Sequence, residues 1–404
     1  MNRVYSETVR GHINEWDVSA VTTMKRLFKD KTAFNDDIGN WDVGNVTNMQ
    51  EMFSSALSFS RSISAWDVGN VTTMKDMFDN ATCFNQSLHE WDVGKVTDMS
   101  GMFCTAASFN HPLDKWNVRN VIHMSHMFHH AIAFNQPLNS WDVSSVCDMK
   151  AMFAKNDVFN HPLCNWKVGN VTTMFGMFNN CNAFNQVLNT WDVHNVTNMR
   201  IMFMKAVSFN TPLHDWDVSG VVDMCNMFAF TLAFNQPLDS WDVGNVENMH
   251  CMFAHNTIFN HPLRTWNVGK VTTMEGMFAR ASSFNQFLTN WDVSNVTNMR
   301  YMFLDATSFN APLHKWDVGS VVDMYGMFAG TTSFIQALSN WNVSNVRYME
   351  VMFHGSRNDM GSTRYWDVSR VRDGRNGRNG RNGRNGRNGN SGNSGNSGNS
   401  CCIM

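Results

Sequence analysis

Residues able to do chemistry recur at one fixed interval along this 404-residue sequence. All 15 Trp lie 25 residues apart, from Trp16 to Trp366. If each Trp is counted as position 1 of a repeat, position 2 is acidic in most repeats and forms a candidate interaction face. Its members are Asp17, Asp42, Asp67, Asp92, Asp142, Asp192, Asp217, Asp242, Asp292, Asp317 and Asp367.

Two interpretations of this aspartate column stay open. Stacked carboxylates repel one another and need counter-ions, a cationic partner or local hydrogen bonds. The favoured interpretation is an Asx-type bond to a backbone N–H in the following turn, which Asn can form equally well. Asn117, Asn267 and Asn342 occupy the same position, and Lys167 is the one basic exception. The alternative is that the column binds cations such as Ca²⁺, or a basic ligand.

Other clusters favour packing over catalysis. The segment HMSHMFHH spaces His123, His126, His129 and His130 as ligands of a metal could be spaced, but those repeat positions vary, so we expect a surface without metal. The M-x-x-M-F pairs match core packing better than copper binding. The Asn ladder at Asn110, Asn135, Asn235 and Asn285 is expected to satisfy turn backbone. The sequence contains no P-loop, G-x-S-x-G or H-E-x-x-H pattern, and we therefore expect no enzyme, cofactor or small-molecule substrate.

The C-terminal segment has a different character. It reads (GRN)₅G, then Asn-Ser-Gly repeats, then CCIM. Cys401 fits the first position of a C-a-a-X prenylation motif. One lipid binds a membrane only marginally, and nearby arginines would add attraction to an anionic surface. These arginines are Arg375, Arg378, Arg381, Arg384 and Arg387.

The elements that position these residues are repeats of W-D-V-x-N-V-T-x-M-x-x-M-F-x-x-A-x-x-F-N-x-P-L-x-x. A 25-residue unit cannot enclose its own core, so successive coils must bury one another's apolar side chains. The alternation of Trp291 and Val293 predicts a short strand. The spacing of Met299, Met302 and Ala306 predicts one helical or 3₁₀ turn.

The domain organisation follows from the repeat. We predict an N-terminal cap over residues 1–15, a solenoid of 14 full repeats plus a partial closing coil over 16–372, and a disordered tail over 373–404. The segment 370–404 holds seven Arg and one Asp, whereas the net charge of the whole chain is -3. An acidic body with a basic tail is not typical of a nucleic-acid-binding protein.

The repeat FNQPLxxWDVSNVTNMxxMFxxA resembles the 25–26-residue repeat of bacterial and mycoplasma surface proteins, which is related to BspA-like leucine-rich repeats. Similar arrays occur in protists and giant viruses. The resemblance covers roughly residues 13–371. It implies a right-handed, leucine-rich-repeat-like solenoid with a parallel β-sheet along one side and short helical or 3₁₀ turns on the other.

The sequence as given starts with MNRVYSETVRGH and shows no signal peptide, so the extracellular location of the bacterial proteins is not carried over. We expect a non-enzymatic protein-interaction scaffold. It would be held at a cytoplasmic membrane face by the lipidated tail, in a eukaryotic cell or a virus that infects one. The alternative is a soluble structural or adhesion-type repeat protein, associated with a surface or a virion, whose tail is inert.

Overall fold

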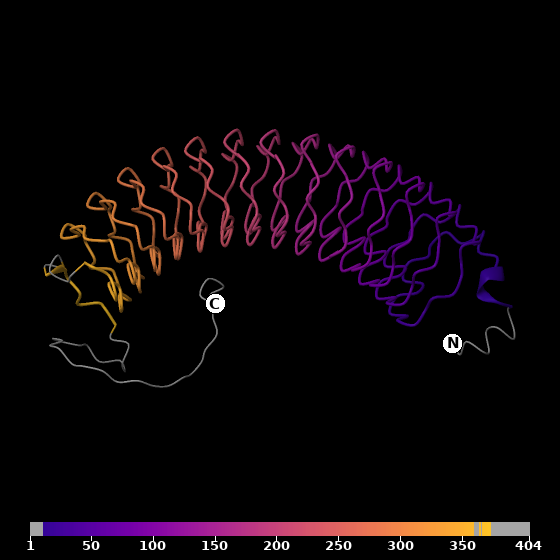
Figure 1. Ribbon diagram of the computed structural model, residues 1–404, viewed down its shortest axis with the longest axis horizontal. Helices are drawn as coiled ribbons and strands as arrows, with labels where there is room; N and C mark the ends of the chain where they lie inside the picture. The colour runs from indigo at the N-terminus through magenta and orange to yellow at the C-terminus, as the bar shows by residue number, and fades with distance from the viewer. Residues whose placement is uncertain (1–10, 359–362, 365, 373–404) are drawn as a thin grey trace. The chain divides into compact units, whose positions relative to one another are not determined.

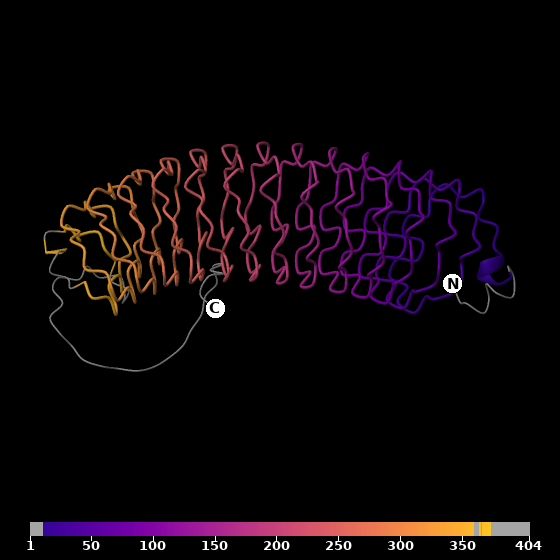
Figure 2. The ribbon, with the colours of Figure 1, turned by 45° about the horizontal axis from the view of Figure 1, so that its top comes forward.

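A computed structural model describes residues 11–358, 363–364 and 366–372. The chain divides into two compact units, residues 1–245 and 246–404. Each unit is a stack of 25-residue coils in which every turn of the chain lies against the turn before it (Figures 1 and 2). The predicted repeat solenoid is therefore confirmed for each unit.

The core is built from the same repeat positions in every coil. In the coil that starts at Trp141, the side chains at positions 1, 3, 6, 9, 12, 13, 16, 19 and 23 are between 0 and 2% exposed. All but one of these nine are apolar, because position 16 holds Asn156. Burying a large apolar side chain contributes about 1.5–3 kcal/mol to the stability of the folded state. Each additional coil therefore adds to that stability through the apolar side chains that it buries.

Aromatic rings form continuous columns within the units. Phe128 stacks on Phe134 in the same coil at 4.0 Å between ring centroids, and on Phe153 in the next coil at 5.7 Å. The indoles of Trp116 and Trp141 stack at 6.4 Å. Buried indole N–H groups also donate to carbonyls at position 23, 28 residues earlier in the chain, as in the 2.9 Å bond from Trp166 Nε1 to the Leu138 oxygen.

The contact between coils is a ladder of backbone hydrogen bonds over positions 7 to 15. In the coil that starts at Trp141, the N–H groups of Met149, Ala151, Phe153 and Lys155 donate to carbonyls of the next coil. Isolated parallel bridges join position 8 of successive coils, from Thr23 to Asp223 in the first unit and from Asn248 to Tyr348 in the second.

The strand predicted at Trp-x-Val is not formed in the described residues. The segment turns there instead, since the N–H of Val146 donates to the Val143 carbonyl at 2.9 Å. Asn170 Nδ2 donates to the Ser144 carbonyl of the neighbouring coil at 2.7 Å. A side-chain hydrogen bond therefore joins the two coils here, where a β-strand would use a backbone hydrogen bond. The parallel contact predicted by the repeat therefore lies several residues further along, as single bridges.

The predicted helical turn is also absent. Positions 11 and 15 have positive φ in coil after coil, for example 50° at Ala151 and 59° at Lys155. A left-handed residue every fourth position breaks an α- or 3₁₀-helix and is typical of successive turns with a left-handed third residue. Among the described residues the one regular helix is the 3₁₀ helix η1, Ile13–Glu15, within the predicted N-terminal cap.

Candidate interaction surface

Position 2 faces outward because it lies between the buried side chains at positions 1 and 3. All eleven aspartates of the predicted column are exposed. Asp192, for example, has 62% of its side chain accessible. The column is thus a set of carboxylates that face the solvent. The core side chains at positions 1 and 3 fix the backbone on either side of each carboxylate.

The Asx interpretation of these residues is confirmed. Asp42 Oδ1 accepts the Gly44 N–H at 3.0 Å, and Asp142 Oδ1 accepts the Ser144 N–H at 3.1 Å. Asn267 makes the same bond to Gly269, which explains why Asn replaces Asp in some repeats. Where position 4 is Ser, its hydroxyl and N–H lower the pKa of the aspartate, as at Asp142. Aspartates followed by Ser at position 4 therefore stay charged at neutral pH while they form the turn.

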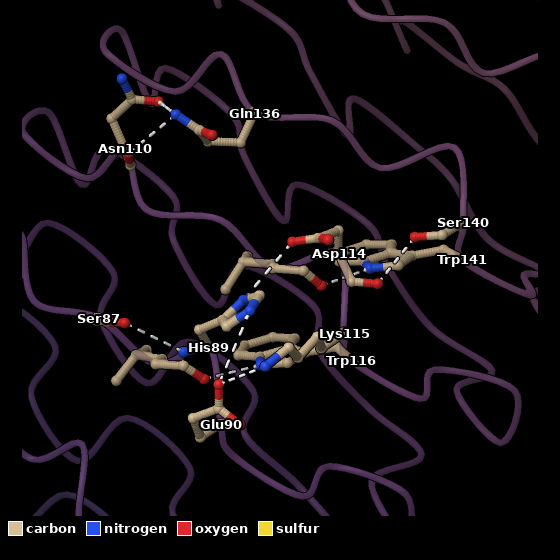
Figure 3. Close-up of polar contacts among 12 residues, drawn as sticks. Ser87, His89, Glu90, Asn110, Asp114, Lys115, Trp116, Gln136, Ser140 and Trp141 are labelled. Carbon is tan, nitrogen blue, oxygen red and sulfur yellow. Dashed lines mark hydrogen bonds and ion pairs between the residues drawn. The ribbon is translucent and has the colours of Figure 1, made fainter.

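The Asn ladder at position 20 is structural, as predicted. Asn110 Oδ1 accepts the N–H of Asn135 at 3.0 Å, and Asn285 Oδ1 accepts the N–H of Asn310 at 2.8 Å. Gln136 adds a second layer by donating to both the carbonyl and the side-chain oxygen of Asn110 (Figure 3). These side chains therefore satisfy backbone groups of the neighbouring coil.

Charged side chains collect next to the aspartate column in the segment that leads into Trp116. Figure 3 shows His89 between Glu90 and Asp114, with Lys115 reaching the same Glu90. Lys115 Nζ lies 2.6 Å from Glu90 Oε1, and His89 Nδ1 lies 3.6 Å from Asp114 Oδ1. The surface around Trp116 is therefore a mixed-charge extension of the column.

The same face is hollowed where the column changes sign. A groove of about 590 Å³ lies around Lys167, and Asp192, His194, Cys164 and Asn170 contribute to its walls. His194 Nδ1 lies 2.6 Å from Asp192 Oδ1. Lys167 and Asp192 thus give this groove one basic and one acidic side chain, a charge pattern that the repeat alone does not predict.

The rings of the histidine cluster lie close to one another. His126 and His129 meet edge to face at 5.5 Å, and burial, followed by the charges of His126 and Lys155, lowers the pKa of His129 to about 4. Within the described ranges, no three His, Cys, Asp or Glu side chains are placed to hold a metal ion.

One cluster was missed by sequence reasoning. In the second unit the Arg300 guanidinium lies 4.7 Å from the ring centre of Tyr301 and 4.2 Å from that of Tyr325, and 3.6 Å from a carboxylate oxygen of Asp323. These residues belong to two coils and meet only when the coils stack. The signal that could have found them is composition, because tyrosine is rare in this chain and two of the five are here.

The predicted lipidation site Cys401 and the five tail arginines lie outside the described residues, and these predictions stay untested. No helix in the described part of the chain is long and apolar enough to cross a membrane.

Comparison with solved structures shows which proteins this chain resembles. Solved structures that resemble the chain include a leucine-rich repeat protein from Bacteroides ovatus, at 10% identity, a TM-score of 0.46, and coverage of 82% of this chain and 79% of that one. A leucine-rich repeat protein of Leptospira interrogans is 8% identical over 88% of both chains, with a TM-score of 0.25. An internalin of Listeria monocytogenes is 10% identical over 74% of this chain and 81% of that one, with a TM-score of 0.24.

A search of curated protein sequences finds no match. A family model described as "Mycoplasma protein of unknown function, DUF285" matches residues 1–116, 87–189, 176–291 and 280–382. These overlapping matches follow the repeats through most of the chain. The chain therefore belongs to this family of BspA-like repeat proteins.

Proposed function

We propose that this protein is a non-enzymatic interaction scaffold whose aspartate column binds basic segments of a protein partner. The observation that carries the proposal is the exposure of carboxylates whose direction is fixed by bonds such as that from Ser144 to Asp142. A partner then meets charges that need no further ordering, and pre-organised groups lose less entropy on binding.

The same geometry supplies a clean test, because Asn preserves the Asx bond and removes only the charge. The variant Asp142→Asn, Asp192→Asn, Asp217→Asn keeps the turns, as natural Asn267 does. We expect it to bind a fluorescently labelled lysine-rich peptide about tenfold more weakly, because each exposed charge contributes roughly 0.5 kcal/mol. Fluorescence anisotropy at low ionic strength and at about 0.15 M salt measures the effect.

A matched control removes the same number of negative charges at position 8, where the parallel bridges join the coils. Asp98, Asp148 and Asp223 occupy position 8, where they take part in the parallel bridges. Asn at these three sites, as found naturally at Asn198 and Asn248, should leave peptide binding unchanged. Equal losses in both triple variants would mean that net charge alone attracts the peptide, and the proposal would fail.

The Arg300 cluster favours a second contact surface for a protein. Tyrosine and arginine are over-represented among residues that carry binding energy at protein interfaces. The Arg300 guanidinium lies against both tyrosine rings, which meet edge to face at 5.2 Å. We expect Tyr325→Ala to lower the affinity of a protein partner that docks on this cluster and to leave the affinity for the lysine-rich peptide unchanged.

Attachment to an anionic membrane through Cys401 is proposed on the tail sequence alone. Mass spectrometry of the C-terminal peptide from eukaryotic cells tests it: farnesylation with trimming leaves a modified Cys401 as the last residue. An unmodified peptide that ends at Met404 would reject the tether and support the soluble alternative.

A further inference from the structure

One stretch of the backbone ladder in the first unit carries basic side chains at regular places. Over residues 141–215, which form three coils, positions 9, 12, 13 and 16 are buried. Positions 10, 11, 14 and 15 therefore supply the outer surface of the ladder. In these three coils they hold four basic residues and no acidic residue, whereas Asp76 and Asp79 occupy positions 11 and 14 of an earlier coil.

The four basic residues form two rows, which together we call the basic patch. Lys150 and Arg200 occupy position 10, and Lys155 and Lys205 occupy position 15, so the two members of each row are two coils apart. All four residues are exposed. Lys150 Nζ lies 5.3 Å from the ring centre of Phe175, and Lys205 Nζ lies 5.6 Å from that of a phenylalanine in the following coil. These cation–π contacts favour one direction for each ammonium group, so less entropy is lost when an anion binds.

The surface between the two rows is low and apolar. Ala151 and Ala154 are 5% and 3% exposed, and Gly176 has no side chain. The Ile201 side chain leans over this glycine, because its Cδ1 would lie 3.3 Å from a Cβ added there. Ile201 and Met204 are both partly exposed, so they give the strip between the rows an apolar surface that a partner can contact.

The spacing within each row matches the repeat of an α-helix. Strands joined by parallel bridges lie about 4.8 Å apart, and the position 13 rings of these three coils are 5.7 Å apart. Two coils therefore span about 10–11 Å along each row. Seven residues of an α-helix rise about 10.5 Å, so a helix laid along the coils can bring one acidic side chain per heptad to each basic residue of a row.

Two other linear ligands fit the basic patch less well. Side chains on one face of an extended peptide recur about every 6.6–6.8 Å, which does not match the step of the rows at one or at two repeats. A single nucleic-acid strand binds largely by stacking its bases on aromatic ring faces, and Lys150 already lies over a face of Phe175. Charge and spacing together therefore favour a helix with acidic edges.

We propose that the basic patch binds an acidic amphipathic helix of a protein partner, with the helix axis along the stack of coils. Apolar side chains three and four residues apart on that helix contact the strip at Ile201 and Met204. Asp or Glu side chains on both edges of its apolar stripe pair with the two basic rows. This surface does not depend on the aspartate column, and it gives the scaffold a second partner of opposite charge.

Fluorescence anisotropy with a labelled synthetic peptide of three heptads tests the proposal. The peptide carries Leu at heptad positions a and d and Glu at positions e and g, and it is used at nanomolar concentration so that it does not pair with itself. The full chain is titrated into it at about 0.15 M salt. A control peptide of the same composition has its Glu residues at positions b and c, and we expect it to bind about tenfold more weakly.

Charge reversal of one row tests the geometry. Lys155→Glu combined with Lys205→Glu should weaken binding of the first peptide about tenfold or more, because like charges then meet. Placing Lys at either position e or position g of the peptide should restore binding to this variant in one of the two cases. Lys31→Glu combined with Lys95→Glu makes the same change of charge on exposed residues outside the patch, and it should leave the affinity unchanged. Circular dichroism checks that both variants are folded.

Several results would overturn the proposal. These are no saturable binding of the first peptide up to about 100 μM protein, equal affinity for the two Glu peptides, or failure of both Lys-containing peptides to restore binding. A labelled poly(U) strand that binds more tightly than the peptide, and that loses affinity in the Lys155→Glu, Lys205→Glu variant, would assign the patch to single-stranded nucleic acid instead.

Discussion

At the residue scale, Glu51 is a buried carboxylate with two basic neighbours from the preceding coil. It is 6% exposed, and Arg26 Nη2 lies 2.8 Å from its Oε1, while Lys29 contacts its other oxygen. Hydrogen bonds from Arg26 and then Lys29 lower its pKa from 4.5 to about 2. The folded state therefore gains stability above pH 4.5 and loses it as the pH falls toward 2.

We expect Glu51→Gln to lower the free energy of unfolding by about 1–2 kcal/mol at pH 7, a figure reduced for solvent around Arg26. The loss should shrink steadily below pH 4.5, where the wild-type carboxylate is also becoming protonated in the unfolded chain. Urea unfolding at pH 7 and pH 3 measures it. An equal loss at both pH values would mean that packing, not charge, explains the effect.

His129 shows the opposite pH dependence. Burial keeps the pKa of this imidazole near 4, below its ordinary 6.5, so the unfolded chain takes up a proton first as the pH falls. The stability that depends on neutral His129 is complete above pH 6.5 and declines toward pH 4.

We expect His129→Ala to reduce the loss of melting temperature between pH 7 and pH 5, because Ala154 fills the same repeat position without titrating. His123→Ala is the control, since His123 is an exposed histidine of the same cluster. If both variants keep the wild-type slope, titration of His129 does not affect folding.

At the element scale, the run of turns over positions 9 to 16 depends on which residues are left-handed. Ala151 has φ of 50°, whereas Ala154 is not left-handed, and both are buried. Glycine removes the cost of positive φ at the first site and only adds chain entropy at the second.

Ala151→Gly should therefore be neutral or stabilise by up to about 1 kcal/mol, and Ala154→Gly should destabilise by about 0.5–1 kcal/mol. The two substitutions remove the same methyl group three residues apart, so each controls for the other. Thermal unfolding measures both, and a shift of the same sign in the two variants would contradict the role of backbone handedness.

The core could be predicted from the sequence, but the turns could not. Apolar periodicity identifies which side chains are buried, and residues such as Met299, Met302 and Ala306 are indeed inside. The same spacing of buried residues fits either a helical turn or two successive turns with left-handed residues. The pattern of burial therefore does not show whether φ is positive or negative. Glycines at position 11, such as Gly276 with φ of 60°, were the available hint.

The candidate surface was predictable to a similar degree. The aspartate column follows from the alternation of buried and exposed positions, and its Asx bonds follow from the Asn replacements. The Arg300 cluster could not be predicted, because Tyr301 and Tyr325 are 24 residues apart and meet only through the offset of neighbouring coils.

At the scale of the whole molecule, the invariant 25-residue step predicts tolerance to the loss of a complete repeat. Deleting residues 142–166 joins Trp141 to Lys167, so every later residue keeps its repeat position. We expect the shortened chain to fold with cooperative melting and a modestly lower melting temperature, because stability in such arrays is close to a sum over neighbours.

Deleting residues 142–153 is the matched control. That change brings Ala154 next to Trp141 and moves every apolar side chain of the joined coil out of register. It should expose core side chains and bind a hydrophobic dye such as ANS. If both deletions melt alike, the period does not set the fold.

The indole column has an optical consequence. From Trp116 to Trp241 successive indoles lie 6.3–6.5 Å apart, with planes within 4° of parallel. Identical chromophores held this close pass excitation to one another faster than they emit light. Fluorescence from one tryptophan therefore reports on its neighbours, and oxidation of a single indole should quench emission along several coils.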